Sequence, residues 1–506
     1  MQVAADARVL GAARKKSRRA QNATEKLIKL FFGGNALVAV LVLALITIFL
    51  FREGFGFFGQ NLTNLRLYRQ AGLEYVDIMR GVTERHEALS RKLSEIRLRQ
   101  VRLLERDGRS SEEIAAALLA FDQFASQFSD SAENLRGLVS DLSEQATVLK
   151  EQLSAGDISS RDQTLALIRQ SDLGFGSVSA DMSARIEDLL RATPTLPNSE
   201  EQKSFEEWKT AARQYLAALP AAVARLREWS PEAPVPWYRS ISSFLLGREW
   251  VTASFWQDWY GIVPLFVGSV MVAFVALFIA VPFGVASAIY VSEVAVPVER
   301  RLIKPYIEFI AAIPSVVLGF FGIAVVGQAL RAASQSELLR GVPFFPIGER
   351  LNIFTAGSLL ALMAIPTIFT LAEDALRNVP RGFKEASYAL GANRLQTIGR
   401  VIVPASLSGI VSAILLGLGR VIGETMVVLL CAGNRIAIPD FTQGLGTFFQ
   451  PVHTMTGIIA QEMGEVVRGS IHYRALFMVG LVLFAITLGI NWVAQRFVAR
   501  FRMSIG

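Results

Sequence analysis

Six stretches of the sequence are long and apolar enough to cross a lipid bilayer. A membrane-spanning helix needs about 20 predominantly apolar residues. The stretches that meet this length are residues 32–51, 262–291, 307–330, 353–376, 407–432 and 475–495. A long segment, residues 52–261, separates the first stretch from the second, and in it apolar residues recur at a helical period among polar ones. The pattern therefore predicts a membrane protein with one large insertion between its first two spans.

Within residues 52–261, apolar residues recur at alternating steps of three and four, which is the period of an amphipathic helix. The stripes are Leu89, Leu93, Ile96 and Leu103; Leu135, Val139, Leu142, Leu149 and Leu153; Val178, Met182, Ile186 and Leu189; and Phe205, Trp208, Ala212, Tyr215, Leu219, Ala222 and Leu226. Ser110 and Glu113 fit a capping box, which marks a helix start. We expect an antiparallel helical bundle with these stripes in its core. A sensor or docking module is the alternative, although the segment contains no ligand-binding constellation.

These patterns predict an all-α fold: a polytopic membrane protein with six transmembrane helices and an inserted helical bundle. The predicted parts are residues 1–51, a basic tail with the first span; residues 52–261, the helical domain; and residues 262–506, a five-helix core. The first span follows the basic run Arg14–Arg19 and precedes Phe51-Arg52-Glu53, without a small-residue cleavage site. We expect this span to be retained as an anchor.

The composition supports a membrane protein, since 52% of the 506 residues are hydrophobic and 19% are charged. The net charge of +7 arises outside residues 52–261, beside the predicted spans. A lipid bilayer with an anionic leaflet is therefore the expected partner of these basic segments, and nucleic acid is not. The single cysteine, Cys431, excludes an internal disulfide.

The distribution of Lys and Arg predicts the orientation, because short basic connections stay in the cytoplasm. Lys and Arg are frequent in residues 1–31, 292–306, 377–406 and 496–506 and sparse in residues 331–352 and 433–474. Both termini are therefore predicted to be cytoplasmic, and residues 52–261 are predicted to be extracytoplasmic.

Several kinds of catalytic chemistry are missing from the sequence. It contains no Gly-x-x-x-x-Gly-Lys-Ser/Thr loop, which would hold a nucleoside triphosphate. His86, His453 and His472 are far apart and do not combine with Cys or acidic residues at a metal-ligand spacing. No serine lies in a nucleophile-elbow motif. We therefore expect no catalytic residue, no metal and no cofactor in this chain.

The segment between the fourth and fifth predicted spans contains Glu385-Ala386-Ser387, then Gly391, then Val401-Ile402-Val403-Pro404. This arrangement resembles the coupling motif of binding-protein-dependent ABC importer permeases, which is Glu-Ala-Ala, three residues, Gly, nine residues, and aliphatic-x-aliphatic-Pro. Ser387, Val401 and Val403 depart from the usual Ala, Ile and Leu. The resemblance implies that Glu385, Ala386, Ser387 and Gly391 couple the chain to a cytoplasmic ATPase. A short helix ended by a glycine turn can also seat as a knob in a cleft of a soluble partner on physical grounds. The alternative is an ordinary solvated loop helix.

The fifth predicted span carries two charged residues, Arg420 and Glu424. A charge in the hydrocarbon costs on the order of 2.5–3.5 kcal/mol on insertion scales, so Arg420 should face protein or a water-filled cavity. A spacing of four places both side chains on one helix face, where they can pair. Two interpretations are open: an ion pair that locks the fold, or a cation on the path of an anionic substrate. The arginine fork suits phosphate, to which it donates two parallel hydrogen bonds.

Three further segments indicate one particular branch of this permease family. Gly247–Trp250, Ala311–Gly319 and Gly417–Met426 are similar to the C-type permease subunit of the phosphate-specific (Pst) importer family. The similarity begins at about residue 241, includes the first span by position, and leaves out residues 52–240. It implies an inner-membrane permease with Arg420 and Glu424 on the path of phosphate. The implied partners are a homologous A-type permease subunit, two copies of a cytoplasmic ATPase, and an extracytoplasmic phosphate-binding protein.

Two other functions fit parts of the sequence. A permease for another oxyanion, such as sulfate or molybdate, would share the architecture. A transmembrane receptor could use residues 52–261 as a sensor, but it would need a cytoplasmic signalling module. The longest predicted cytoplasmic segment, residues 1–31, is too short to fold as one.

The predicted orientation can be tested with single cysteines introduced at Ser140, Thr442 and Asn393 in a Cys431→Ala background. In intact cells, a membrane-impermeant thiol reagent should label the first two positions, since both are predicted to lie outside. Asn393→Cys should stay unlabelled until the membrane is permeabilised. Labelling of Asn393→Cys in intact cells would overturn the orientation.

Overall fold

The computed structural model describes residues 2–156, 161–252, 254, 257–337 and 345–501, with side chains except at 2–28, 167–173, 200 and 497–501. The chain divides into two compact units. The membrane unit comprises Met1–Gly59, Phe244–Trp250 and Tyr260–Gly506. The bundle unit comprises Gln60–Ser243 and Val251–Trp259.

The membrane unit is built almost entirely from helices. Its α-helices are α1 (Gln2–Gln70) and α7 (Tyr238–Leu245), which are shared with the bundle unit, and α8 (Val263–Ile289), α9 (Pro297–Ala311), α10 (Ser315–Phe321), α11 (Gly327–Ser334), α12 (Ile353–Arg377), α13 (Arg381–Ala389), α14 (Arg394–Thr397), α15 (Val403–Gly423), α16 (Met426–Cys431), α17 (Met455–Glu462) and α18 (Ile471–Phe501). In the described part of this unit, the π-helical segments η1 (Tyr290–Val294), η2 (Gly322–Val326) and η4 (Ile398–Ile402) extend or join these helices, and η5 (Phe441–Phe449) is a 3-10 segment. The short strands β1 (Trp250–Val251) and β2 (Trp259–Tyr260), which are also shared with the bundle unit, pair with each other.

Six helical segments of the described chain are long and apolar enough to cross a membrane, which confirms the predicted all-α, six-span fold class. They are Lys29–Gln70, Val263–Val294, Ser315–Ser334, Ile353–Arg377, Arg394–Gly423 and Ile471–Arg496. The number agrees with the prediction from hydropathy, whereas several of the boundaries differ.

The first helix runs on to Gln70, past the predicted end of its span at residue 51, and the third and fifth spans are shifted at both ends. Helix α9 ends at Ala311, and α10 begins at Ser315 with Pro314 as its N-cap. Because proline disfavours helical backbone in the preceding residue, the apolar run that begins at residue 307 is divided between two helices. The fifth span begins earlier than predicted, at Arg394, and its helix α15 ends at Gly423.

Close helix contacts hold the membrane unit together around α8, α12 and α15. A Cβ atom added at Gly409 of α15 would overlap the Cβ atom of Ala375 on α12. One added at Gly417 would lie 2.7 Å from Cγ1 of Ile368, also on α12. Gly417 thus lets α15 approach α12 closely, whereas at Gly419 and Gly423 an added Cβ would have no heavy atom within 4 Å. Small residues let the two helices pack backbone to backbone, which is how helices associate in lipid.

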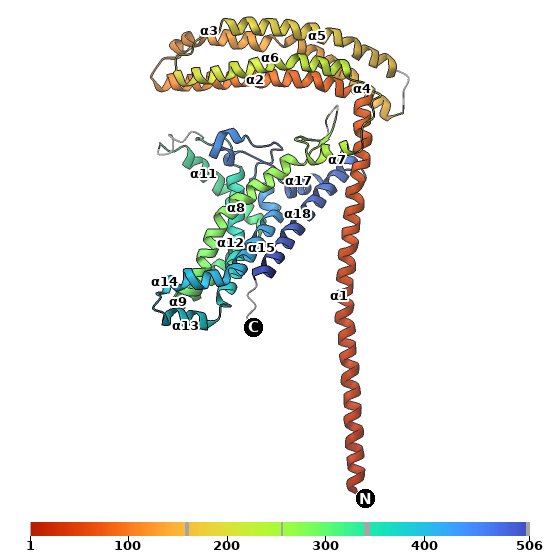
Figure 1. Cartoon of the computed structure of the whole chain (residues 1–506), viewed down its shortest axis with the longest axis vertical. Helices are drawn as coiled ribbons and strands as arrows, with labels where there is room; N and C mark the ends of the chain where they lie inside the picture. The colour runs from red at the N-terminus through yellow and green to blue at the C-terminus, as the bar shows by residue number, and fades with distance from the viewer. Residues whose placement is uncertain (1, 157–160, 253, 255–256, 338–344, 502–506) are drawn as a thin grey trace. The chain divides into compact units, whose positions relative to one another are not determined.

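The short helices of the membrane unit gather at opposite ends of the long ones. Helices α9, α13 and α14 lie together at one end of α8, α12 and α15, and α11 and α17 lie at the other (Figure 1). Residues 292–306 and 377–406, which are the basic connections, are thus on one side, and residues 433–474 are on the opposite side.

The bundle unit contains α2 (Leu73–Arg106), α3 (Ser111–Asp130), α4 (Glu133–Ser154), α5 (Arg161–Arg191) and α6 (Ser199–Glu228). Helix α2 packs against α3, α4 and α6, and α5 packs against α4 and α6. Ser110 and Glu113 form the predicted capping box at the start of α3. The stripes supply the core, although Leu104 is buried in place of Leu103. Four stripe residues are only half-buried: Leu153, Val178, Leu189 and Ala222.

His86 of α2 lies at the point where α3 gives way to α4. Its ring stacks on Phe128 with 4.4 Å between ring centroids, and its Nε2 donates to the Phe128 carbonyl at 2.9 Å. Its Nδ1 has no hydrogen-bond partner among the described residues. Burial lowers the pKa of His86, and the nearby Arg136 guanidinium adds to this effect although the Phe128 carbonyl opposes it. His86 is therefore a neutral cap on the carbonyl end of α3.

The buried neutral state of His86 predicts a pH-dependent stability of the bundle unit. As the pH falls below the ordinary histidine value of about 6.5, the unfolded chain binds a proton before the folded one does, so the free energy of unfolding decreases by at most about 1.4 kcal/mol per pH unit. Urea unfolding of a soluble fragment, residues 60–259, between pH 7.5 and 5 measures this loss. His86 is the only histidine in that fragment, so His86→Gln, which retains a donor for Phe128, should remove most of the dependence. An unchanged dependence in this variant would assign the loss to other groups.

Candidate functional site

The candidate site on the fifth span is a break in the helix and not the continuous helix face that the sequence suggested. Arg420 lies in the last turn of α15, and the helix ends at Gly423. Glu424 is extended, with φ −71° and ψ 134°, and α16 begins at Met426. The two charged side chains therefore do not share a helix face, and no ion pair joins them in this described segment. In this structure Arg420 and Glu424 therefore do not form the ion pair that the locking interpretation needs.

Glu424 has partners of its own, which explain why the break is stable. Its Oε1 accepts a hydrogen bond from the backbone N–H of Met426 at 3.2 Å, at the start of α16. Its backbone carbonyl accepts from Oγ1 of Thr456 at 2.8 Å. Backbone N–H and C=O groups that leave a helix inside a bilayer need hydrogen-bond partners from the protein. At this break, the Glu424 carboxylate accepts from the N–H of Met426, and Thr456 of α17 donates to the Glu424 carbonyl.

The start of α17 is in turn fixed to α8. The backbone N–H of Met455 donates to Oγ of Ser269 on α8 at 2.9 Å. Gly268 approaches the carbonyl of His453 so closely that a Cβ would overlap it. Thr454 caps α17 by accepting from the N–H of Gly457. The broken span is thus connected through Thr456 and Met455 to a long central helix.

Arg420 projects into open space at the surface of the unit. Its side chain is exposed, and a Cβ added at Gly419 or Gly423, on either side of it, would meet no neighbouring heavy atom within 4 Å. Arg420 makes no ion pair with any residue whose side chain the structure describes. A guanidinium on the surface of a membrane span is costly in lipid, so this face must meet another protein surface or water.

The coupling segment forms a short helix followed by a glycine turn. Helix α13 ends at Ala389, and Gly391 adopts a left-handed conformation with φ +83°. The N–H of Gly391 donates to the Tyr388 carbonyl and that of Ala392 to the Ser387 carbonyl. Other residues pay a conformational cost at such a φ, so glycine is the natural choice.

The four predicted coupling residues divide into two groups. Glu385, Ala386 and Gly391 are exposed, whereas Ser387 is buried. Oγ of Ser387 and Oγ1 of Thr397 are 2.9 Å apart and share a hydrogen bond. Ser387 therefore holds α13 against α14 and does not face a partner, which sequence spacing alone does not reveal.

Large apolar side chains surround the exposed coupling residues. They are Phe383, Tyr388, Leu390 and Leu395, of which Leu390 is 89% and Leu395 is 76% exposed. Apolar exposure of this extent at a loop tip is typical of a surface that another protein covers. The sequence motif did not indicate these residues.

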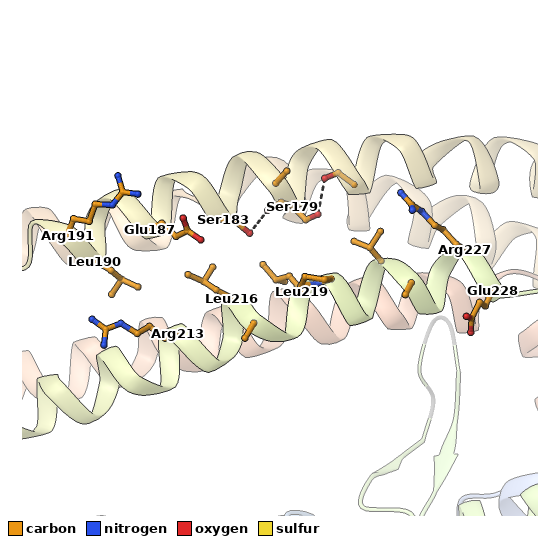
Figure 2. Close-up of a pocket in the computed structure, with 16 residues that line it drawn as sticks. Ser179, Ser183, Glu187, Leu190, Arg191, Arg213, Leu216, Leu219, Arg227 and Glu228 are labelled. Atoms are coloured by element: carbon orange, nitrogen blue, oxygen red, sulfur yellow. Dashed lines mark hydrogen bonds between the residues drawn. The ribbon is translucent and has the colours of Figure 1, made fainter.

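The bundle unit contains a groove between α5 and α6, which Figure 2 shows. The volume of this groove is about 990 Å³. Ser183 and Ser179 line it, but their hydroxyls donate to the carbonyls of Ser179 and Gly176 within α5. No buried polar atom lacks a partner among its described lining residues. The two serine hydroxyls are therefore satisfied within α5, although Arg191, Arg213 and Arg227 also line the groove.

Comparison with known proteins shows the family. Residues 280–503 match the model of the binding-protein-dependent transport system inner membrane component family. The phosphate transport system permease protein PstC of Haemophilus influenzae is 34% identical over 274 residues, which are 52% of this chain and 83% of that protein. The probable ABC transporter permease protein YqgH of Bacillus subtilis is 32% identical over 271 residues, which are 51% and 82% of the two chains. A chain of the MetNI methionine ABC transporter, solved in inward-facing conformations, gives a TM-score of 0.35 at 20% identity and covers 48% of this chain and 94% of that chain.

The chain belongs to the family of binding-protein-dependent transport system inner membrane components. It is a multi-pass permease subunit of an ABC importer, and it is not itself an enzyme. The family implies that the importer also contains an ATPase and a substrate-binding protein. The region between residues 60 and 243 lies outside the range that matches the family model.

Proposed function

We propose that this subunit moves inorganic phosphate across the inner membrane by alternating access. The observation that carries the proposal is the exposed guanidinium of Arg420 beside a fixed, unwound backbone. A permanently cationic fork on a membrane surface attracts an oxyanion and repels cations. PstC of Haemophilus influenzae, which is named as a phosphate transport permease, supports the choice of phosphate among oxyanions.

The surface position of Arg420 indicates how the path is completed. Because exposure of the Arg420 charge to lipid would cost free energy, we propose that a homologous A-type permease subunit covers this face. The path would then run between the two subunits. Both termini would be cytoplasmic, and residues 52–261 would lie outside, near the phosphate-binding protein. The orientation is supported by the basic connections, which gather at the end that holds α9, α13 and α14 (Figure 1).

At that end, the coupling loop would dock in the cytoplasmic ATPase. Glu385, Ala386 and Gly391 are exposed there, and Leu390 and Leu395 project among them. A partly apolar helix end that is fixed to α14 can transmit a rigid-body movement when the ATPase dimer opens and closes. Ser387 contributes because its hydrogen bond to Thr397 holds α13 against α14.

Variants of Arg420 test the substrate path. Because Arg420 has no ion-pair partner in Glu424, Arg420→Gln should assemble normally, yet phosphate uptake per assembled complex should fall at least about tenfold. Arg420→Lys should be intermediate, since a point charge does not reproduce the fork. Glu424→Gln tests the second predicted path residue separately, because its amide oxygen can still accept from Met426 and so leave the break intact. Sulfate and molybdate are added as competitors of labelled phosphate, and stronger competition by either would identify another oxyanion as substrate. Full uptake by Arg420→Gln would remove Arg420 from the path.

Variants of the coupling loop test the docking. Gly391→Val places a β-branched residue at φ +83°, which costs roughly 1–2 kcal/mol or more, and Glu385→Lys reverses an exposed charge. Both should reduce co-purification of the ATPase and abolish uptake, while the permease remains in the membrane. Gly382→Ala is the control in the same loop, since a Cβ there meets no neighbour. Normal uptake in both test variants would exclude the loop as the coupling element.

A further inference from the structure

The cytoplasmic end of α8 is connected to the coupling helix by a shielded ion pair. Nζ of Lys384 on α13 lies 2.6 Å from Oε1 of Glu293 in η1, the π-helical turn that continues α8. The Glu293 side chain is 9% exposed and that of Lys384 is 22% exposed. An ion pair at this depth is screened little by solvent, so breaking it is costly.

The same turn is held from a second side, which makes it rigid. The guanidinium of Arg300 on α9 donates to the carbonyls of Val291 at 2.9 Å and of Ser292 at 2.7 Å. Helix α9 is itself anchored to α12, because Lys304 donates to the fully buried carboxylate of Glu373 at 2.9 Å. The turn at Glu293 is therefore held from two sides, so a movement of α13 acts on a rigid segment.

Helix α8 reaches from this turn to the break beside Arg420. Glu293 is 24 positions from Ser269, a distance of roughly 36 Å along a helix that rises 1.5 Å per residue. Ser269 accepts from the N–H of Met455, and Thr456 donates to the carbonyl of Glu424. The two ends of α8 thus contact the coupling helix and the segment that fixes the broken span.

We infer that the Lys384–Glu293 pair is a positioning link, through which the coupling helix α13 moves α8. The movement of α8 then shifts the start of α17, which supports the helix break at Glu424 beside Arg420. The link complements the covalent route from α13 through α14 and η4 to α15. It rests on the proposed docking of the coupling loop in the ATPase. The link transmits movement from ATP hydrolysis to the path and takes no part in docking itself, since Lys384 points to α8 while the docking side chains are exposed.

Charge reversal in the reconstituted importer, with its ATPase and binding protein, tests this link. Lys384→Glu and Glu293→Lys should each leave the ATPase bound and hydrolysing ATP, while phosphate uptake per ATP hydrolysed falls about tenfold, because the pair becomes repulsive. The double reversal restores an attractive pair and should recover at least about half of the wild-type ratio. Glu293→Gln, which leaves no repulsion, is a milder variant if a reversal does not assemble, and it should show a smaller fall in the same ratio. Reversal of the surface pair Arg97 and Asp122 in the bundle unit is the matched control and should change nothing.

The outcomes separate this inference from the proposals on which it rests. Wild-type ratios in both single reversals, or a double reversal as poor as the singles in an assembled complex, would overturn the link. Loss of ATPase binding in Lys384→Glu would also overturn it, because Lys384 would then belong to the docking surface. Wild-type complexes that hydrolyse ATP without taking up phosphate would contradict the proposed substrate instead. Normal uptake in Gly391→Val and Glu385→Lys would contradict the docking site.

Discussion

The hydrogen-bonding demand of backbone inside a bilayer is the constraint on which the rest of this membrane unit depends. Hydrocarbon offers no partner to an N–H or C=O group, so a helix can be interrupted only where the protein supplies one. At Glu424 the partners are the residue's own carboxylate, bonded to Met426, and the hydroxyl of Thr456. Because Thr456 lies at the start of α17, and Met455 is bonded to α8, the position of Arg420 follows from a chain of hydrogen bonds across three segments.

The two units use different physical means to hold their helices together. In the bundle unit, water drives apolar stripes inward, and aromatic pairs such as Phe205 stacked on Trp208 fill the core. In the membrane unit, lipid gives no such drive, and α12 and α15 associate through close contacts at Gly409 and Gly417. Charges at the end of the membrane unit, including the buried Glu373, connect the short helices to this packed core.

Hydropathy and periodicity were sufficient for the fold class, the number of spans and the bundle, and the Ser110–Glu113 spacing was sufficient for the capping box. They could not locate the breaks at Pro314 and Glu424, because apolar residues continue through both and the partner of Glu424 is distant in sequence. The coupling motif identified the correct short helix, yet it could not show that Ser387 is buried against Thr397. Arg420 could be found from its charge in an apolar run, but its isolation from Glu424 depends on where the helix ends. The sequence signal fails at positions whose partners come from another segment.

The contact between Gly409 and Ala375 has a consequence for how this family can diverge. Ala375 has no flexible side chain that could move aside, so any larger residue at position 409 would force the backbones of α12 and α15 apart. An enlargement at position 409 therefore needs a smaller residue at 375 or a shift of a whole helix, whereas Ala375→Gly alone needs no compensation. The effect of a substitution at 409 thus depends on which residue stands at 375.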